Sequence, residues 1–219
     1  MVEKTSKKQI RKKYTYKLVR YISIALIFLY LGLMLGYYSN PLSTEKVALL
    51  LKTTSSQMDL LNLQFDYLQS MQNCTIDSLL LSNISTEIGG IGRVLSQYDQ
   101  KGIKNDFYYF LKTKYSLFEI RLYMYYKSYM KTCNTNDNIV LYFWSLNNAS
   151  EQQGKILDSL VESHNLKVLS VEYNYSESYQ FIENIYNINS GPALIINYNK
   201  TFIGLTNSSE IIKSLKKNE

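Results

Sequence analysis

Two cysteines and one histidine are the side chains of this sequence best suited to nucleophilic or metal chemistry. Cys74 and Cys133 are 59 positions apart, and His164 is the single histidine among 219 residues. These three side chains cannot form a closed zinc site without carboxylates, and two thiols cannot hold an iron–sulfur cluster within one chain. His164 has no Gly-x-Ser-x-Gly motif to accompany it. We therefore expect no cofactor, no metal and no catalytic residue.

Two helical stretches position the cysteines. Apolar residues recur at helical spacing over Ile76–Tyr98 and Asp106–Lys131, and a polar turn with Gly102 separates the two stretches. An antiparallel hairpin of these helices has arms of nearly equal length, which places Cys74 and Cys133 at the same end. This geometry predicts a structural disulfide, and the alternative is two unpaired, buried cysteines.

A third helical stretch precedes the hairpin. Its apolar positions over Thr44–Gln72 alternate at steps of four and three, which is the period of a coiled-coil seam. A helix start at Asn40-Pro41 suits this pattern, because proline is favoured in the first turn of a helix. We expect the seam to pack within the chain, and the alternative is a homo-oligomer formed through this stalk. The seam residues are Val47, Leu51, Met58, Leu61, Phe65 and Leu68, with Thr54 filling the one gap.

The basic residues of the chain are concentrated at its N-terminus. The net charge is +6, but residues 1–20 contain eight bases and one acid, so the remainder has a net charge of −1. Nucleic-acid binding requires basic residues spread over a folded face, so we expect no nucleic-acid partner. The tail instead precedes an uncharged segment at residues 21–38.

Residues 21–38 have the composition of a transmembrane anchor. With the two preceding apolar residues they reach the ~20 residues that a span requires, and tyrosines occur at both ends of the segment. The alternatives are a cleaved signal peptide and a buried helix. The positive-inside rule then predicts a single-pass protein of the cell membrane with a cytoplasmic N-terminus. The parts that follow, a helical region at 39–134 and a domain at 138–217, are expected to be extracytoplasmic.

The periodicity changes after a polar linker at residues 134–138. Short apolar runs typical of buried strands now alternate with helical patterns, in the order β-α-β-α-β-β-α, which predicts an α/β domain. The first two strands should be parallel and the last two should form a hairpin. In the second helix, Phe181, Ile182 and Ile185 are expected to face inward. The predicted strands are Ile139–Trp144, Leu166–Val171, Ala193–Ile196 and Thr201–Gly204, and the predicted helices are Glu151–His164, Ser178–Tyr186 and Ser208–Leu215.

This C-terminal domain resembles the thioredoxin-like family. Ile139-Val-Leu-Tyr-Phe-Trp-Ser145 is similar to the first core strand of that family, and Lys200-Thr-Phe-Ile-Gly204 is similar to the return strand of its hairpin. Gly191-Pro192-Ala-Leu-Ile-Ile is similar to the loop in which a cis-proline opens the third strand. The resemblance implies a cis bond before Pro192 and a substrate groove lined by the adjacent backbone. Without it, a trans proline at a strand start is expected, and flavodoxin-like or other small α/β units are alternatives.

The redox motif of the family is absent. The positions that match its Cys-x-x-Cys are Asn148 and Glu151, or Asn147 and Ser150 when the alignment is shifted by one residue. A serine hydroxyl cannot carry out thiol–disulfide exchange, so no catalytic residue of the family is retained. Asn148 or Ser150 is instead expected to cap the helix that begins here.

Three functions are compatible with this sequence. The first is a membrane-anchored thioredoxin-like module without redox thiols, which binds a protein or peptide near Gly191 and Pro192. The second is a membrane-tethered thiol–disulfide oxidoreductase that uses Cys74 and Cys133. The third is a structural envelope component that oligomerises through the stalk. The binding function rests on fold-level analogy.

Overall fold

The computed structural model describes residues 20–34, 44–70, 73–164 and 166–215 of the chain. The chain divides into two units, Met1–Ser55 and Ser56–Glu219. In the first unit, the described parts are a helix over residues 20–34 and the beginning of helix α2 (Thr44–Ser70). All of the apolar core described below lies in the second unit.

The transmembrane helix expected at residues 21–38 is not found. The described helix covers residues 20–34, and residues 35–38 lie outside the described residues. Among the described residues, no helix combines the length and the apolar character needed to cross a membrane; a span needs ~20 residues. The predictions of a signal anchor, of a single-pass membrane protein and of its cytoplasmic and extracytoplasmic sides are therefore wrong.

Helices α3 (Cys74–Gln100) and α4 (Asp106–Cys133) form the hairpin. An asparagine caps the start of each helix. Its side-chain oxygen accepts hydrogen bonds from backbone N–H groups that have no partner within the helix. The Asn73 side chain accepts from the N–H groups of Thr75 and Ile76, and Asn105 accepts from that of Tyr108. Asn134 ends α4 in the left-handed conformation, which asparagine tolerates better than most residues.

Helix α2 packs on the hairpin through the C-terminal part of its heptad pattern. Met58, Leu61, Phe65 and Leu68 are all buried within this chain. The Phe65 ring lies parallel to that of Phe118 from α4, with 6.3 Å between the centroids. This half of the seam therefore packs within the chain, as expected, whereas oligomerisation through the stalk remains a prediction.

The C-terminal third forms a four-stranded sheet with strand order β2-β1-β3-β4. Strand β1 pairs in parallel with β2 and antiparallel with β3, and β3 pairs antiparallel with β4. The strands are β1 (Asn138–Trp144), β2 (Leu166–Glu172), β3 (Ala193–Ile196) and β4 (Lys200–Ile203). The helices between and after them are α5 (Asn148–His164), the 3₁₀ turn η1 (Glu177–Tyr179), α6 (Gln180–Ile185) and α7 (Ser208–Ser214).

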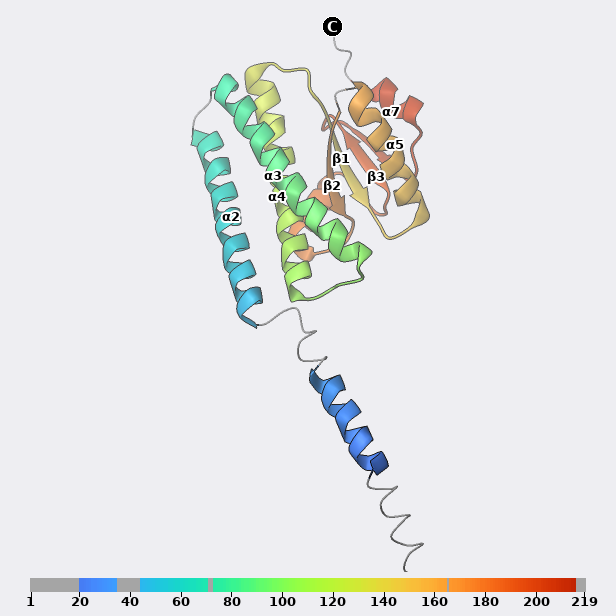
Figure 1. The fold of residues 1–219 in the computed structure, drawn as a ribbon. Helices are drawn as coiled ribbons and strands as arrows, with labels where there is room; N and C mark the ends of the chain where they lie inside the picture. Colours follow the sequence, from blue (N-terminus) through green and yellow to red (C-terminus); the bar gives the residue numbers. More distant parts are fainter. Residues whose placement is uncertain (1–19, 35–43, 71–72, 165, 216–219) are drawn as a thin grey trace, which may run out of the picture. The chain divides into compact units, whose positions relative to one another are not determined.

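The sheet separates two layers of helices, as Figure 1 shows. Alternate residues of β1 point to opposite faces, which is the period of a strand. Ile139, Leu141 and Phe143 belong to the core shared with α2, α3 and α4. Val140 and Tyr142 belong to a second core with residues of α5 and α7. Strand β1 is therefore buried on both faces, which explains its continuous apolar sequence.

The predicted fold class is wrong as stated. That prediction described the chain as an α/β domain preceded by a membrane span and a stalk. Helices α2, α3 and α4 are each 27 or 28 residues long, so the described chain is mostly helical and its mixed sheet is small. The α/β interpretation rested on the C-terminal third alone, and it underestimated how far the helices share one core with the sheet.

Polar contacts also join the hairpin to the sheet. Lys112 of α4 forms an ion pair with Glu172 of β2. The Lys112 Nζ also lies over the rings of Tyr108, Trp144 and Tyr175, at 5.5, 5.1 and 4.6 Å from their centroids. Aromatic faces attract cations, so the hairpin and the sheet together hold this lysine in place.

Candidate functional site

Helix α5 begins where the redox motif of the thioredoxin-like family would lie, and Asn147 caps it. The Asn147 Oδ1 accepts from the backbone N–H of Ser150 at 2.8 Å. This is the bond that an N-cap residue makes to the third residue of a helix. The sequence placed the cap at Asn148 or Ser150, so the expected cap was wrong by one residue or more.

Asn147 also connects the start of α5 to the proline loop. Its Nδ2 donates to the carbonyl oxygen of Gly191 at 3.0 Å, and the Gly191–Pro192 bond is cis. A Cβ atom at Gly191 would clash with the side chain of Ser145 and would lie 3.1 Å from its backbone nitrogen. The two loops therefore touch, and the backbone acceptor beside Pro192 already has an internal donor.

The Ser150 side chain is buried and takes part in the same network. Its Oγ accepts from the backbone N–H of Ser145 at 2.9 Å, and the Ser150 carbonyl accepts from the Tyr142 hydroxyl at 2.6 Å. Burial raises the pKa of Tyr142, so this hydroxyl stays protonated and keeps donating at neutral pH. Ser150 therefore stabilises the loop rather than presenting a nucleophile.

Glu151 and Asn148 lie on the exposed side of the same turn. The Glu151 carboxylate pairs with Lys155 one turn later at 2.6 Å, and the hydrogen bond and charge of Lys155 lower the pKa of Glu151. The structure thus joins the predicted site residues Asn147, Ser150 and Gly191, which precedes Pro192, by hydrogen bonds, whereas Asn148 and Glu151 are exposed on the same turn.

A depression of about 530 Å³ lies beside this turn. Tyr142, Trp144 and Gly154 form part of its lining, together with Leu146, whose side chain is 80 % exposed. An exposed leucine next to aromatic side chains favours contact with apolar groups of another molecule. The arrangement can bind, and its hydrogen-bonding groups are mostly engaged internally.

The cysteines are joined to each other in another part of the fold. Cys74 and Cys133 form a disulfide between the first residue of α3 and the last residue of α4, with 5.6 Å between their Cα atoms. Cys74 is exposed and Cys133 is half-buried. Neither cysteine lines the depression. No cluster of three or more metal-binding side chains occurs among the described residues.

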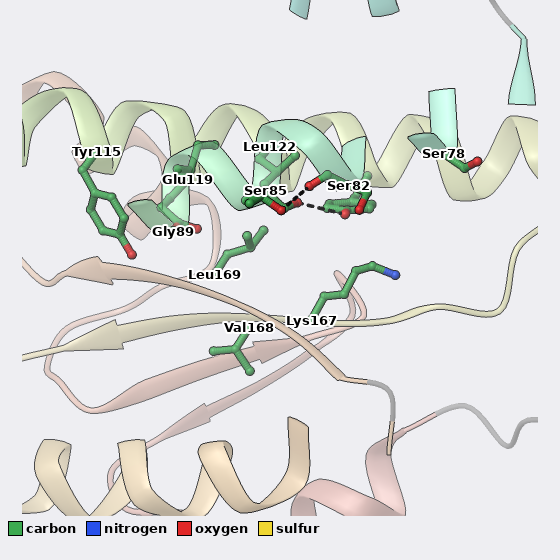
Figure 2. A pocket seen from close by; sticks show the side chains of 13 residues that line it. Ser78, Ser82, Ser85, Gly89, Tyr115, Glu119, Leu122, Lys167, Val168 and Leu169 are labelled. Carbon is green, nitrogen blue, oxygen red and sulfur yellow. Dashed lines mark hydrogen bonds between the residues drawn. The ribbon is translucent and has the colours of Figure 1, made fainter. Parts of the chain in front are cut away.

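Sequence reasoning missed a second polar region, which Figure 2 shows. Glu119 of α4 is 6 % exposed and faces a cavity between α3, α4 and β2. The signal that could have identified it is an acid flanked by Phe118 and Ile120 within an aromatic helix. A buried acid in such surroundings is costly unless it has partners.

Comparisons with known proteins give no family for this chain. No family model matches it, and no curated protein does. One solved structure with some similarity is described as "Structure of a malarial protein". It is 22 % identical, covers 36 % of this chain and 92 % of its own, and has a TM-score of 0.31. A match at this level supports no conclusion about fold or function.

Proposed function

We propose that residues 138–217 form a thioredoxin-like module without redox thiols that binds an extended peptide beside the start of α5. The observation that carries this proposal is the depression lined by Leu146, which is 80 % exposed, and by half-buried Trp144. The cis bond at Pro192 and the order β2-β1-β3-β4 support the family resemblance.

The hydrogen bonds of the loop favour binding over catalysis. Asn147 and Ser150 match the family thiols when the alignment is shifted by one residue, and both engage the protein's own backbone. The Gly191 carbonyl already accepts a hydrogen bond from Asn147. We therefore do not expect a peptide to bind mainly by pairing as an extra strand at that carbonyl. Contact through apolar side chains at Leu146 and Trp144 is the mode that remains.

Selection from a random peptide library tests this proposal. The full chain is immobilised and used to enrich peptides from a phage-displayed 12-residue library, and the affinity of each enriched peptide is measured by calorimetry. We expect at least one apolar peptide whose affinity falls tenfold or more in Leu146→Asp. Gly154→Arg, which places a large side chain in the depression, should have the same effect.

Leu63→Asp is the matched control. Leu63 of α2 is 64 % exposed, so the substitution introduces the same charge on another largely exposed leucine outside the depression. Enrichment of peptides that bind Leu146→Asp and the unmodified chain equally would contradict the proposal.

The exposed end of the disulfide supports a second candidate, a thiol–disulfide oxidoreductase that uses Cys74 and Cys133. A reduced Cys74 would lie at the start of α3, and helix N-termini lower the pKa of a thiol. Acid quenching followed by alkylation and peptide mass spectrometry measures the fraction of bridged cysteines. Complete bridging that resists mild reductant would exclude this candidate, whereas a mixed population would support it.

A further inference from the structure

The cavity beside Glu119 has the size of a ligand site. It measures about 590 Å³ and lies between a face of α3, a face of α4 and strand β2; ligand pockets typically measure ~300–1,000 Å³. Figure 2 shows Ser78, Ser82 and Ser85 along α3 on one side and Lys167 on β2 on the other. It shares no lining residue with the depression at Leu146.

The hydroxyl groups on the α3 side present acceptors to this cavity. A hydroxyl carries one proton, and three of these residues donate it to the backbone of their own helix. Ser78 donates to the Thr75 carbonyl at 2.9 Å, Ser85 to that of Leu81 at 2.8 Å, and Thr86 to that of Ser82 at 2.9 Å. Their oxygens therefore retain lone pairs and no free proton.

Tyr126 of α4 completes the same pattern. Its hydroxyl lies 3.3 Å from the Ser85 Oγ. Either hydroxyl can donate in this pair, and Tyr126 is the donor when the Ser85 proton is directed to Leu81. In that arrangement both hydroxyl protons of the pair are engaged, and neither is offered to the cavity.

Glu119 is an incompletely satisfied acid in this cavity. Its carboxyl group accepts from Tyr115 and from the backbone of Ser170. Its Oε2 atom is buried and has no hydrogen-bond partner. A buried polar atom without a partner costs about 1–3 kcal/mol, and a ligand that supplies the missing partner recovers that free energy.

We propose that this cavity binds a small organic ammonium ion, whose N–H groups donate to Glu119 Oε2 and to the hydroxyl oxygens of α3. A primary ammonium has three donors and no acceptor, which complements a surface rich in acceptors. Tyr115 also lines the cavity, and aromatic rings attract organic cations. The Tyr126 ring already has the Lys167 Nζ 5.5 Å from its centroid. A single carboxylate provides too few charged ligands for a divalent metal ion.

The charged and titratable groups around Glu119 determine the pH dependence. Burial raises the pKa of Glu119 to about 8, although its two hydrogen bonds act in the opposite direction. Tyr115 and Tyr126 have raised pKa values, chiefly because of burial, so both stay neutral. Lys167 of β2 lines the cavity, and its Nζ forms an ion pair with Asp137 Oδ1 at 2.7 Å. On α3, the Arg93 guanidinium lies near Gly89.

Binding of an ammonium ion should therefore strengthen as Glu119 ionises. Alkylammonium ions resemble the lysine side chain and remain charged below pH ~10. With a carboxyl pKa of about 8, the affinity should rise roughly 50-fold between pH 6 and pH 8. It should level off above that range.

The test uses n-butylammonium chloride and the full chain. Titrations followed by amide NMR shifts at pH 6, 7, 8 and 9 give the affinity, with n-butanol as the neutral probe of similar shape. We expect saturable shifts around Ser85, Glu119 and Lys167, at least tenfold weaker binding of n-butanol, and the pH profile described above. Equal affinities for the two probes, or an affinity independent of pH, would overturn the proposal.

Two variants separate binding from folding. Glu119→Gln keeps the shape of the protonated acid, and we expect at least tenfold weaker binding with no pH dependence. Glu87→Gln is the matched control, because it removes a charge on the exposed side of α3 and should bind as the unmodified chain does. Wild-type affinity in Glu119→Gln would refute the proposal.

Ser82→Phe provides a test that leaves Glu119 intact. Ser82 is exposed at the edge of the cavity, so the larger side chain should obstruct the ligand without loss of thermal stability. Retained binding in this variant would place the ligand elsewhere and overturn the proposal. Because the cavity and the depression share no lining residue, this outcome is independent of the peptide experiment.

Discussion

The turn at the start of α5 and the cavity beside Glu119 differ in whether their polar groups have hydrogen-bond partners within the protein. At the turn, Asn147 and Ser150 make hydrogen bonds within the protein, although Asn147 itself is exposed to solvent. In the cavity, Glu119 is almost fully buried but keeps an oxygen without a partner. The exposed region is thus internally satisfied, and the buried region is not.

This difference separates shape recognition from polar recognition. A surface whose polar groups are engaged offers a partner mainly its apolar contour, here Leu146 and Trp144. A cavity with a free acceptor selects instead for a ligand with the complementary donor, because water is excluded and the missing bond is costly. The first arrangement suits a peptide and the second suits a small ion.

Removal of the disulfide should lower the free energy of unfolding more than any other change considered. Of the two binding regions, it should affect only the cavity beside Glu119. We expect Cys74→Ala combined with Cys133→Ala to lower the free energy of unfolding by about 4 kcal/mol, because the bridge closes a loop with a sequence separation of 59. Urea unfolding measures this loss, and binding of n-butylammonium should weaken while peptide binding at Leu146 is kept.

Reductant provides the control for the double variant. The unmodified chain treated with reductant should lose the same stability, and the variant should be insensitive to the treatment. Equal weakening of both binding sites would show that the two regions are not independent.

The pH dependence of stability should come next in size. The folded pKa of Glu119 is raised to about 8 from 4.5, so between these values the folded chain holds a proton that the unfolded chain has lost. Stability should therefore fall as the pH rises through this window, by roughly 1 kcal/mol per pH unit from this group. Above pH 8 the contribution should be constant.

Glu119→Gln isolates this contribution. Asp77 and Glu183 also have raised pKa values caused mainly by burial, so the difference between the unmodified chain and Glu119→Gln is the quantity to follow in urea unfolding from pH 5 to pH 8. A difference that does not change with pH would mean that Glu119 is ionised throughout.

The smallest expected effect concerns the cap of α5. Asn147→Ala should lower the free energy of unfolding by about 1 kcal/mol, because the helix loses its cap and the Gly191 carbonyl loses a donor. Asn148→Ala changes the neighbouring exposed residue and should stay within ~0.5 kcal/mol. Urea unfolding measures the stability of both variants. An equal loss of stability in the two would contradict the assignment of Asn147 as the cap.

The sequence predicted best where a periodic pattern was long. The two hairpin helices were expected from their apolar spacing, and nearly equal arms placed Cys74 and Cys133 together, where the structure joins them. The pattern was weaker in the segment after β2. Of the three residues expected to face inward, Ile182 is buried, but Phe181 and Ile185 are 47 % and 64 % exposed. A 3₁₀ turn precedes the short α6, and its Tyr179 is buried in their place.

The candidate sites were less accessible to sequence reasoning, because they depend on contacts between distant residues. The bond from Asn147 to Gly191 spans 44 positions, and no local pattern predicts it. In the sequence, Glu119 looks like any polar residue of an amphipathic helix. Only the folded structure shows that β2 covers it. Composition alone also overstated the N-terminal apolar segment, because no helix among the described residues is long and apolar enough to cross a membrane.

The bridge between the ends of α3 and α4 makes the hairpin a closed covalent ring. The polypeptide connects these helices at the turn after Gln100, and the bridge between Cys74 and Cys133 connects them at the other end. A single protease cut anywhere between residues 75 and 132 therefore opens the ring without dividing the molecule. The cut protein should run as one chain on a denaturing gel and separate into two fragments only after reduction, so both walls of the Glu119 cavity stay tethered even when the backbone is broken.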